Sequence, residues 1–578
     1  MAVFKGVAAS PGIAIGEAYV IQEKEIEIST EKIPEEKIQR EIETFRRAIS
    51  ASKEQIDKIR QKTLEEMGEE KAQIFQAHMM ILEDPSLVEA VEKKIKEEYI
   101  TAENALYQVT EEYVNIFMQM EDEYLRERAS DIKDVSARVM KNILGIQANT
   151  LADMDREVVI VAKDLTPSET AQIDKKKVLA FAADVGGRTS HMAIMARSLE
   201  KPAVLGLSKI TANVKTGDRI IVDGNEGVVI VNPDEQVYEE YLNLKQKYME
   251  YKEELKRLKE MAGITTDGCR VELSANIGTP EDVCGALQNG AEGIGLYRTE
   301  FLYMHRDEVP SEEEQFKAYR EVAEKMQGKP VIIRTLDIGG DKKLPYLDMP
   351  EELNPFLGWR AIRMCLDRPE ILKTQLKAIL RASGYGSFKI MYPMVSSVEE
   401  IRKANGILEE AKEELRREGV SFDNKLQVGI MVEIPSAAVT ADLLAKEVDF
   451  FSIGTNDLVQ YTLAVDRMNA KLSHMYDPFH PAVLRLIKNV IDSSHDNGKW
   501  TGMCGEMAGD PLAAPILVGM GIDELSMSAA SIPQVKRIIR SLSLEEAKGI
   551  VEKVFKMESS QEIRNYLKDV VGSILKRN

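Results

Sequence analysis

A repeating order of apolar runs and helical segments fills the second half of this 578-residue chain. After Gly268 the order is strand, loop, helix, and eight apolar strand candidates begin near Val271, Gly293, Val331, Lys389, Gln427, Phe450, Trp500 and Glu524. Eight such units in about 300 residues are typical of a (β/α)8 barrel, whose chemistry lies where the strands end. The pattern therefore predicts a closed barrel with its site on one face.

Polar residues follow these strand candidates, as that arrangement requires. They are Arg298, Arg334 with Asp337, Met394, Glu433, Asn456 with Asp457, and Cys504 with Glu506. Guanidinium groups bind both phosphate and carboxylate. Arg298, Arg334 and Arg467 are therefore expected to form a cationic cradle for a small molecule that carries both groups.

Two carboxylates and a thiol complete this face of the expected barrel. Glu433 and Asp457 follow neighbouring strands, and two carboxylates together with phosphate oxygens are the usual ligands of Mg²⁺. Cys504 lies in the run Gly502-Met503-Cys504-Gly505-Glu506. Two interpretations of this thiol stay open from the local residues: a buried structural cysteine, or a proton donor at the barrel mouth.

A second stretch with chemical potential runs from Gly186 to Arg197 and reads Gly-Gly-Arg-Thr-Ser-His-Met-Ala-Ile-Met-Ala-Arg. The glycine pair allows close backbone approach, and a Thr-Ser pair before a helical segment leaves N–H groups for an anion. We expect His191 to be a nucleophile toward phosphorus, with Arg188 and Arg197 offsetting the phosphoryl charge. The competing interpretation is a capped helix start with a buried histidine.

The first half of the chain predicts an α/β domain interrupted by helices. Residues 1–30 alternate like short strands, and further strand-like runs begin at Val158, Val178, Ile220 and Val228. Between them, from Ile33 to about Gly145, apolar residues recur every three or four positions, which is typical of a helical bundle. Breaks at Met67-Gly68, Asp84-Pro85-Ser86 and Ile100-Thr101 divide the bundle into about four helices.

We therefore expect four parts. They are an α/β domain (1–30 and 146–232), an inserted helical subdomain (31–145), a linker helix (233–262) and the barrel (263–578). A formal net charge of −20 argues against nucleic acid as a partner. The chain has no uninterrupted apolar run of about 18 residues, so we expect no membrane insertion. Its four cysteines show no CxxC spacing, which favours a reducing cytoplasm.

The long motifs resemble the enzyme I family of the bacterial phosphoenolpyruvate:sugar phosphotransferase system over essentially the whole chain. The matching stretches are Gly186 to Arg197, Gly295 to Leu302, Arg334 to Lys342, Asn354-Pro355 with Gly358-Trp359-Arg360, Met431 to Pro435, Phe451 to Leu458, and Gly502 to Glu506. The resemblance implies a swivelling phosphohistidine α/β domain with an inserted helical bundle, followed by a (β/α)8 barrel that binds phosphoenolpyruvate and forms a homodimer.

The resemblance also implies a role for each matching residue. His191 attacks phosphorus through Nε2 and passes the phosphoryl group to a histidine of the carrier protein HPr, as the first step of sugar uptake. Thr170 is expected to hydrogen-bond the other ring nitrogen of His191. Cys504 would protonate C3 of the enolate to give pyruvate. The remaining matches are Arg298, Arg334, Asn456, Asp457 and Arg467 for the substrate, Glu433 and Asp457 for Mg²⁺, and Arg360 with Arg188 and Arg197 in support.

In the same family the inserted helices bind HPr. We assign this surface to Glu69, Glu70, His78, Glu83, Asp84 and Arg128. Two other interpretations stay open: a charge run on a helix is ordinarily a solvated face, and His78 is also interpretable as a core or capping histidine.

Related enzymes provide the alternatives. Dikinase-like and phosphoenolpyruvate synthase-like enzymes carry a large nucleotide-binding domain ahead of these parts, whereas this chain has no GxxxxGK[ST] motif and has a helical insertion. A non-catalytic regulatory partner would have lost His191, the arginines or the acidic pair, and all of these are present.

Overall fold

The computed structural model resolves the chain into two compact units, Met1–Tyr251 and Lys252–Asn578. It describes residues 1–21, 28–29, 31–67, 69–119, 123–146, 156–165, 174, 176–187, 190–304, 306–340, 342, 344–469 and 471–576, although the side chains of 62, 65–67, 69–73, 123–128, 130, 191 and 198 lie outside the description. The finer division expected within the first unit stays a prediction.

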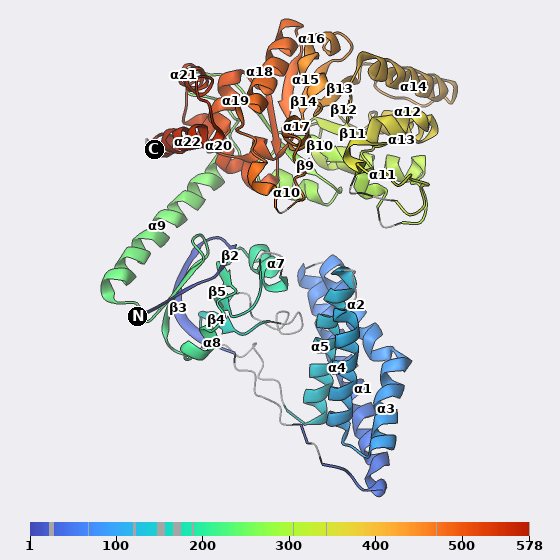
Figure 1. Cartoon of the computed structure of the whole chain (residues 1–578), viewed down its shortest axis with the longest axis vertical. Helices are drawn as coiled ribbons and strands as arrows, with labels where there is room; N and C mark the ends of the chain where they lie inside the picture. The colour runs from blue at the N-terminus through green and yellow to red at the C-terminus, as the bar shows by residue number, and fades with distance from the viewer. Residues whose placement is uncertain are drawn as a thin grey trace. The chain divides into compact units, whose positions relative to one another are not determined.

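An eight-stranded mixed sheet organises one part of the first unit, with strand order β1-β8-β7-β3-β4-β5-β6-β2 (Figure 1). Its strands come from both sides of the helical insertion, as predicted. They are β1 (Ala2–Lys5), β2 (Val7–Ser10), β3 (Ile13–Val20), β4 (Val158–Ala162), β5 (Val178–Ala183), β6 (Ala203–Leu205), β7 (Arg219–Asp223) and β8 (Val228–Val231).

Each face of this sheet carries its own apolar core. Alternate residues of β4 point to opposite faces, so that Val158 and Ile160 join one core while Val159 and Val161 join the other. The helix α7 (His191–Ser198) buries Met192 and Met195 in the first core, and α8 (Ile210–Asn213) buries Ile210 in the second. The sheet is therefore covered on both faces.

The inserted helices form a bundle around a separate apolar core that includes Phe45, Ile56, Val91 and Leu106. The described residues form five helices rather than the predicted four: α1 (Ile38–Met67), α2 (Glu69–Glu83), α3 (Pro85–Glu98), α4 (Ala102–Met118) and α5 (Glu123–Ile143). The prediction missed the break between α4 and α5 because no glycine or proline marks it in the sequence.

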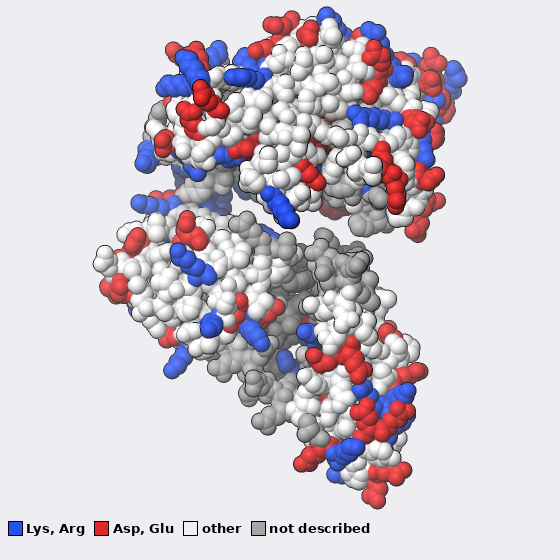
Figure 2. Space-filling model, in the orientation of Figure 1, with Lys and Arg blue, Asp and Glu red and all other residues white. Residues whose placement is uncertain are grey.

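A long helix, α9 (Glu235–Leu258), follows β8 in the chain, contains the boundary between the two units and has no buried residue. On the face shown in Figure 2, acidic and basic side chains are interspersed over the helices of both units. On this face the acidic side chains are therefore not gathered in one patch.

The second unit is the predicted closed barrel of eight parallel strands, ordered β10 to β16 and closed by β9 (Figure 1). Each strand begins within one residue of its predicted start. The strands are β9 (Glu272–Ile277), β10 (Gly293–Arg298), β11 (Val331–Arg334), β12 (Phe388–Tyr392), β13 (Gln427–Val432), β14 (Phe450–Ile453), β15 (Trp500–Met503) and β16 (Glu524–Met527).

Helices surround the barrel and bury their apolar stripes against it. They are α10 (Asp282–Gln288), α11 (Glu312–Met326), α12 (Ala361–Asp367), α13 (Pro369–Ala382), α14 (Val398–Arg417), α15 (Pro435–Val439), α16 (Ala441–Leu444), α17 (Thr455–Leu463), α18 (Pro481–Asp496), α19 (Ala514–Met520), α20 (Ile532–Arg540), α21 (Leu544–Val554) and α22 (Ser560–Leu575). Inside the barrel, Leu296, Ile332, Met391, Met431 and Phe450 form a small apolar core that also contains Cys504.

Candidate active site

The predicted site residues of the barrel come together at the carboxyl ends of its strands. Arg298 and Arg334 are register partners at the ends of β10 and β11. Glu433 follows β13, Asp457 lies in the first turn of α17 after β14, and Cys504 follows β15. Because all the strands are parallel, these ends open at one mouth of the barrel.

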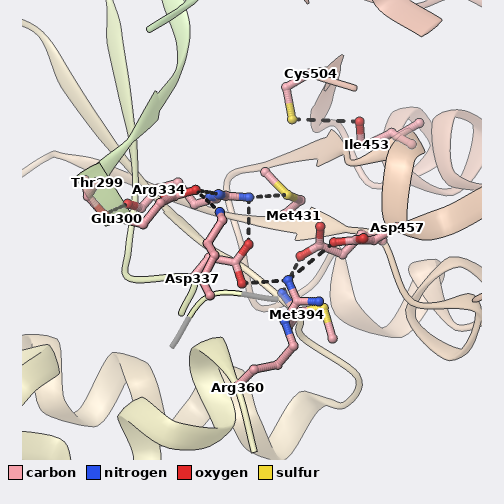
Figure 3. Close-up of polar contacts among 12 residues, drawn as sticks. Thr299, Glu300, Arg334, Asp337, Arg360, Met394, Met431, Ile453, Asp457 and Cys504 are labelled. Carbon is pink, nitrogen blue, oxygen red and sulfur yellow. Dashed lines mark hydrogen bonds and ion pairs between the residues drawn. The ribbon is translucent and has the colours of Figure 1, made fainter. Parts of the chain in front are cut away.

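Arg334 is held by carboxylates on two sides (Figure 3). Its Nη2 donates to Oε1 of Glu300 over 2.6 Å, and its Nη1 lies 3.0 Å from Oδ2 of Asp337. Lys342 reaches the same Glu300 oxygen at 2.7 Å. Burial alone would lower the pKa of Arg334, but the charges of Glu300 and Asp337 outweigh burial and raise it. Arg334 therefore stays cationic in an almost fully buried position.

Asp337 joins two arginines. Its Oδ1 accepts from Nη2 of Arg360 over 2.9 Å while its other oxygen faces Arg334. Burial would raise the pKa of Asp337, yet the two guanidinium groups lower it well below its ordinary value. Asp337 is therefore a permanent anion that fixes the spacing of the two cations.

Glu433 lies 2 % exposed and accepts a hydrogen bond from the backbone N–H of Met394 over 2.6 Å. Met394 supplies this N–H from a left-handed conformation with φ 57°, which is uncommon outside glycine. Burial, followed by the neighbouring charges of Asp457 and Asp337, raises the pKa of Glu433 to about 8. A cation beside this carboxyl group would reverse the shift.

The two carboxylate oxygens of Asp457 differ in their contacts with the described residues. Its Oδ2 lies 3.5 Å from Nη2 of Arg360, whereas its buried Oδ1 has no hydrogen-bond partner among the described residues. A buried carboxylate oxygen without a partner is costly, so a ligand at this point is chemically favoured. Two hard carboxylates beside each other, one of them with an open oxygen, fit a hard divalent cation such as Mg²⁺.

Asn456 and Arg467 line the mouth beside this pair. The side chain of Asn456 accepts from the backbone N–H of Glu506 over 2.9 Å, and the Asn456 carbonyl accepts from the hydroxyl of Tyr476 over 3.2 Å. Burial raises the pKa of Tyr476 to about 12, and Arg467 is close enough for its positive charge to oppose that shift. The charge of Arg467 therefore acts on Tyr476, and its place in the predicted cradle stays a prediction.

The thiol of Cys504 is 3 % exposed and lies 3.9 Å from the carbonyl oxygen of Ile453. Burial raises the pKa of Cys504 to about 11, although a hydrogen bond with the side chain of Ser452 partly opposes this effect. At neutral pH the group is a protonated thiol inside the barrel, which is the state that a proton donor needs.

The second predicted site lies in the first unit, where α7 begins at His191. Ser190 caps the helix by accepting from the N–H of Ala193, and its hydroxyl donates to the carbonyl of Gly187. Arg197 is exposed, and its Nη1 donates to the carbonyl of Ala9 over 3.0 Å. The His191 side chain, Arg188 and Thr170 lie outside the described residues. His191 thus stands at the positive end of a helix, as predicted.

Comparison with known proteins now adds to this geometry. The chain matches the families described as "PEP-utilising enzyme, PEP-binding domain" over residues 252–544, "PEP-utilising enzyme, N-terminal" over 5–128 and "PEP-utilising enzyme, mobile domain" over 154–227. Curated phosphoenolpyruvate-protein phosphotransferases from Staphylococcus carnosus and Haemophilus influenzae are each 52% identical, over 97% and 98% of both chains respectively. The chain belongs to the phosphoenolpyruvate-protein phosphotransferase family.

A solved solution structure of an Enzyme I protein shares 53% identity and covers 43% of this chain and 99% of its own, with a TM-score of 0.39. Members of the phosphoenolpyruvate-protein phosphotransferase family are phosphotransferases, so the enzyme class expected from the motifs is confirmed. Within the residues that the structure describes, no helix has the length and apolar character of a membrane span.

One predicted partner contact of this phosphotransferase does not lie on the surface. His78 in α2 has no exposed area, packs edge-on against Phe75, and has Asp131 3.4 Å from its Nε2. This burial favours the core interpretation of His78, and its role toward a partner stays a prediction. The core interpretation agrees with the structure.

Of the other residues predicted to bind HPr, the structure describes the side chains of only two, Glu83 and Asp84. Glu83 ends α2 and is exposed, and Asp84 caps α3 by accepting from the N–H of Ser86 over 2.9 Å. Glu69 and Glu70 lie in α2 and Arg128 lies in α5, but their side chains fall outside the description. Their role therefore stays a prediction.

Sequence reasoning missed several residues of this phosphotransferase site. Glu300, Tyr461 and Asn276 contact the predicted site residues Arg334, Arg360 and Cys504 respectively. Lys342 contacts Glu300. Glu300 and Lys342 lie inside the matched motifs, so the sequence marked both as functional candidates. It did not indicate that Glu300 contacts Arg334 and Lys342. Asn276 lies within a strand, where no spacing rule distinguishes it.

Proposed function

We propose that this phosphotransferase transfers the phosphoryl group of phosphoenolpyruvate first to His191 and then to a histidine of the carrier HPr, releasing pyruvate. The observation that carries the proposal is the barrel mouth itself. Arg334 and Arg360 are fixed around Asp337, and beside them Asp457 presents a buried oxygen that accepts no hydrogen bond from any described residue. Fixed cations next to an open carboxylate suit an anionic donor that arrives with a divalent cation.

Arg298, Arg334, Arg467 and Asn456 would bind the phosphate and carboxylate groups of the donor. Their guanidinium and amide groups supply donors in planar arrays, which orient an anion as well as attract it. The carboxylates of Glu300 and Asp337 hold Arg334 before the donor arrives, so little reorganisation is needed during transfer. Arg360 acts through Asp337 and Asp457, as a positioning residue.

Glu433 and Asp457 would hold Mg²⁺, which would neutralise charge on the phosphate oxygens when bound. The buried position of Glu433 supports this assignment, because the charge of Asp457 adds to the cost of ionising Glu433 without a cation. The carboxylates themselves keep their place through Met394 and Arg360.

The proposed first step forms an N–P bond at an unprotonated ring nitrogen of His191 and breaks the P–O bond of phosphoenolpyruvate. The electron pair of that bond remains on oxygen and delocalises to C3 as an enolate. Cys504 then gives its S–H proton to C3, which yields pyruvate and a thiolate that solvent reprotonates. The raised pKa of Cys504 supports this order, because the thiol holds its proton until a strongly basic carbon is present.

In the second step the imidazole of HPr displaces the phosphoryl group from His191, which regenerates the free enzyme. The inserted helices would bind HPr, and Glu83 and Asp84 are its proposed acidic contacts among the described side chains. We also propose that the enzyme acts as a homodimer through the barrel, which sedimentation analysis of the purified chain at several concentrations tests directly.

The deciding experiment is incubation of the purified protein with phosphoenolpyruvate and Mg²⁺, alone and with HPr. Acid-labile phosphate is scored on each protein for the wild type, His191→Ala and His495→Asn. His495 is a matched control because it is an exposed histidine paired with Asp523, 2.8 Å away. We expect Mg²⁺-dependent labelling that passes to HPr and is lost only in His191→Ala. Labelling that persists in His191→Ala would assign the chemistry to another nucleophile.

A further inference from the structure

The backbone carbonyl of Cys504 makes a hydrogen bond that does not belong to the pairing of the barrel strands. The pairing of β15 with β16 ends at Met503, whose register partner is Leu525. On its other side, the Cys504 N–H donates to the carbonyl of Ile453 at the end of β14 over 3.1 Å. The Cys504 carbonyl therefore lies beyond the paired part of β15 and β16 and needs a hydrogen-bond donor from outside the strand pairing.

Asn276 replaces that partner. It lies in β9, and its Nδ2 donates to the Cys504 carbonyl over 3.0 Å, from two strands away across β16. Its Oδ1 accepts in turn from the hydroxyl of Ser526 in β16 over 2.6 Å. Ser526 is fully buried, so the amide of Asn276 is fixed in one orientation by a partner that cannot itself move into water.

Glycines make room for this arrangement. A Cβ at Gly295 would lie 2.5 Å from the Ser526 hydroxyl, and one at Gly505 would lie 1.8 Å from Oγ1 of Thr455. Both separations are far below van der Waals contact. The peptide after Cys504 is therefore confined by Thr455 on one side and bound by Asn276 on another, which leaves it a single placement.

We propose that Asn276, fixed by Ser526, is a positioning residue for the proton transfer, because it sets the backbone from which the Cys504 thiol reaches C3 of the enolate. The proposal rests on the proposed function, in which Cys504 is the proton donor. Among the described residues, the side-chain hydrogen bonds of Asn276 go to Cys504 and Ser526 and not to the charged groups of the mouth that would bind the donor. Its loss should therefore disturb delivery of the proton far more than transfer of the phosphoryl group. A displacement of about 1 Å at a reacting group is enough for a large effect.

The stereochemistry of protonation separates these two effects. The probe is the Z isomer of 3-methyl-phosphoenolpyruvate, in a single turnover with Mg²⁺ in ²H₂O. Its product, 2-oxobutyrate, carries deuterium at a stereogenic C3 and is trapped at once by enzymatic reduction to 2-hydroxybutyrate. The enantiomer ratio at C3 and the phosphate on His191 are measured in the same sample, with the full-length protein.

The variants are Asn276→Ala and Asn276→Asp, the second of which keeps the shape but cannot donate to the Cys504 carbonyl. Ser274→Ala is the matched control, because Ser274 is a buried residue of the same strand that pairs in register with Ser526. We expect a single enantiomer from the wild type and from Ser274→Ala. Both Asn276 variants should give a near-racemic product while phosphorylating His191 within about tenfold of the wild-type rate, the effect of losing one neutral hydrogen bond.

Cys504→Ala is measured in the same assay, and three outcomes would contradict the proposed role of Asn276. A single enantiomer from the Asn276 variants, with a racemic product from Cys504→Ala, overturns the proposal and leaves the proposed function intact. A single enantiomer from Cys504→Ala removes the proton-donor step itself. Loss of phosphohistidine in both Asn276 variants would assign Asn276 to folding or substrate binding, which also overturns its role in proton delivery.

Discussion

Nη2 of Arg360 lies 3.5 Å from Oδ2 of Asp457, and it is the same nitrogen that donates to Asp337. The Arg360 guanidinium group therefore links Asp337, which holds the proposed substrate-binding Arg334, to Asp457, which is proposed to bind Mg²⁺. Such a link makes the two proposed subsites dependent on each other, because neither carboxylate is fully balanced without Arg360.

Arg360→Lys should show this dependence. A lysine keeps the charge but has no fork with which to reach both carboxylates. We expect phosphorylation of His191 to slow by at least about 100-fold, and the Mg²⁺ concentration for half-maximal rate to rise. Rapid-quench measurement of phosphohistidine over a Mg²⁺ series tests both effects. Arg402→Lys, in an exposed pair with Glu447, is the control and should behave as the wild type. An unchanged Mg²⁺ requirement in Arg360→Lys would separate the two subsites.

Glu433→Gln should change stability and metal response in opposite directions. Because burial and its neighbours raise the pKa of Glu433 from 4.5 to about 8, the metal-free folded state binds this proton more tightly than the unfolded chain. The contribution of Glu433 to stability is therefore present below the ordinary pKa and is lost as the pH rises toward 8.

We expect metal-free Glu433→Gln to have a higher Tm than the wild type at about pH 8, with a smaller difference at acidic pH. Mg²⁺ with phosphoenolpyruvate should raise the Tm of the wild type only. Thermal unfolding at several pH values, with and without Mg²⁺, measures both effects. Glu447→Gln, at a half-buried residue paired with Arg402, serves as control. A variant that is less stable at every pH would show that Glu433 is balanced by charges of the protein alone.

The sequence predicted which strand ends form this site better than it predicted the side-chain contacts between the site residues. Strand starts and strand ends are local features, so the apolar rhythm was enough to place Arg334, Glu433 and Cys504 at one mouth. The pairing of Glu300 with Arg334 joins residues 34 positions apart, and that of Asn276 with Cys504 joins residues 228 apart. Such contacts depend on barrel closure, which a linear pattern does not specify.

The bundle shows the same limit. The break between α4 and α5 lacks the glycine or proline that marks a turn. His78 is buried although Gln76 and Met80, two positions away on either side, are exposed. Whether a histidine on an amphipathic helix faces the core depends on its rotation within the bundle. Here that rotation is set by Phe75 and the acidic side chains of α5.

Cys504 should resist alkylation more than the surface thiol of Cys284. Burial raises the pKa of Cys504 to about 11, so almost none of it is thiolate near neutral pH, and only the thiolate reacts with iodoacetamide. Cys284 is exposed. Mass spectrometry of peptides sampled over time should show Cys284 labelled first and Cys504 labelled only slowly. Equal rates would mean that a thiolate is present at position 504, and a group already deprotonated is not the proton donor.

Neutralising Glu83 and Asp84 should weaken the transfer to HPr without slowing phosphorylation of His191. Asp84→Asn keeps an oxygen for the N–H of Ser86 and so preserves the cap of α3, and Glu83→Gln gives up only a 3.4 Å pair with Lys53. A charge reversal at Asp84 would confuse loss of charge with loss of the cap.

For the double variant we expect transfer to HPr to fall by about two- to tenfold at low salt, and its dependence on ionic strength to weaken. The transfer rate is measured by mixing phosphorylated enzyme with HPr over a salt series. Glu97→Gln, which removes an exposed charge from α3, is the control and should leave transfer unchanged. If transfer keeps its wild-type rate and salt dependence in the double variant, these two acids belong to an ordinary solvated face, and HPr binds elsewhere on the bundle.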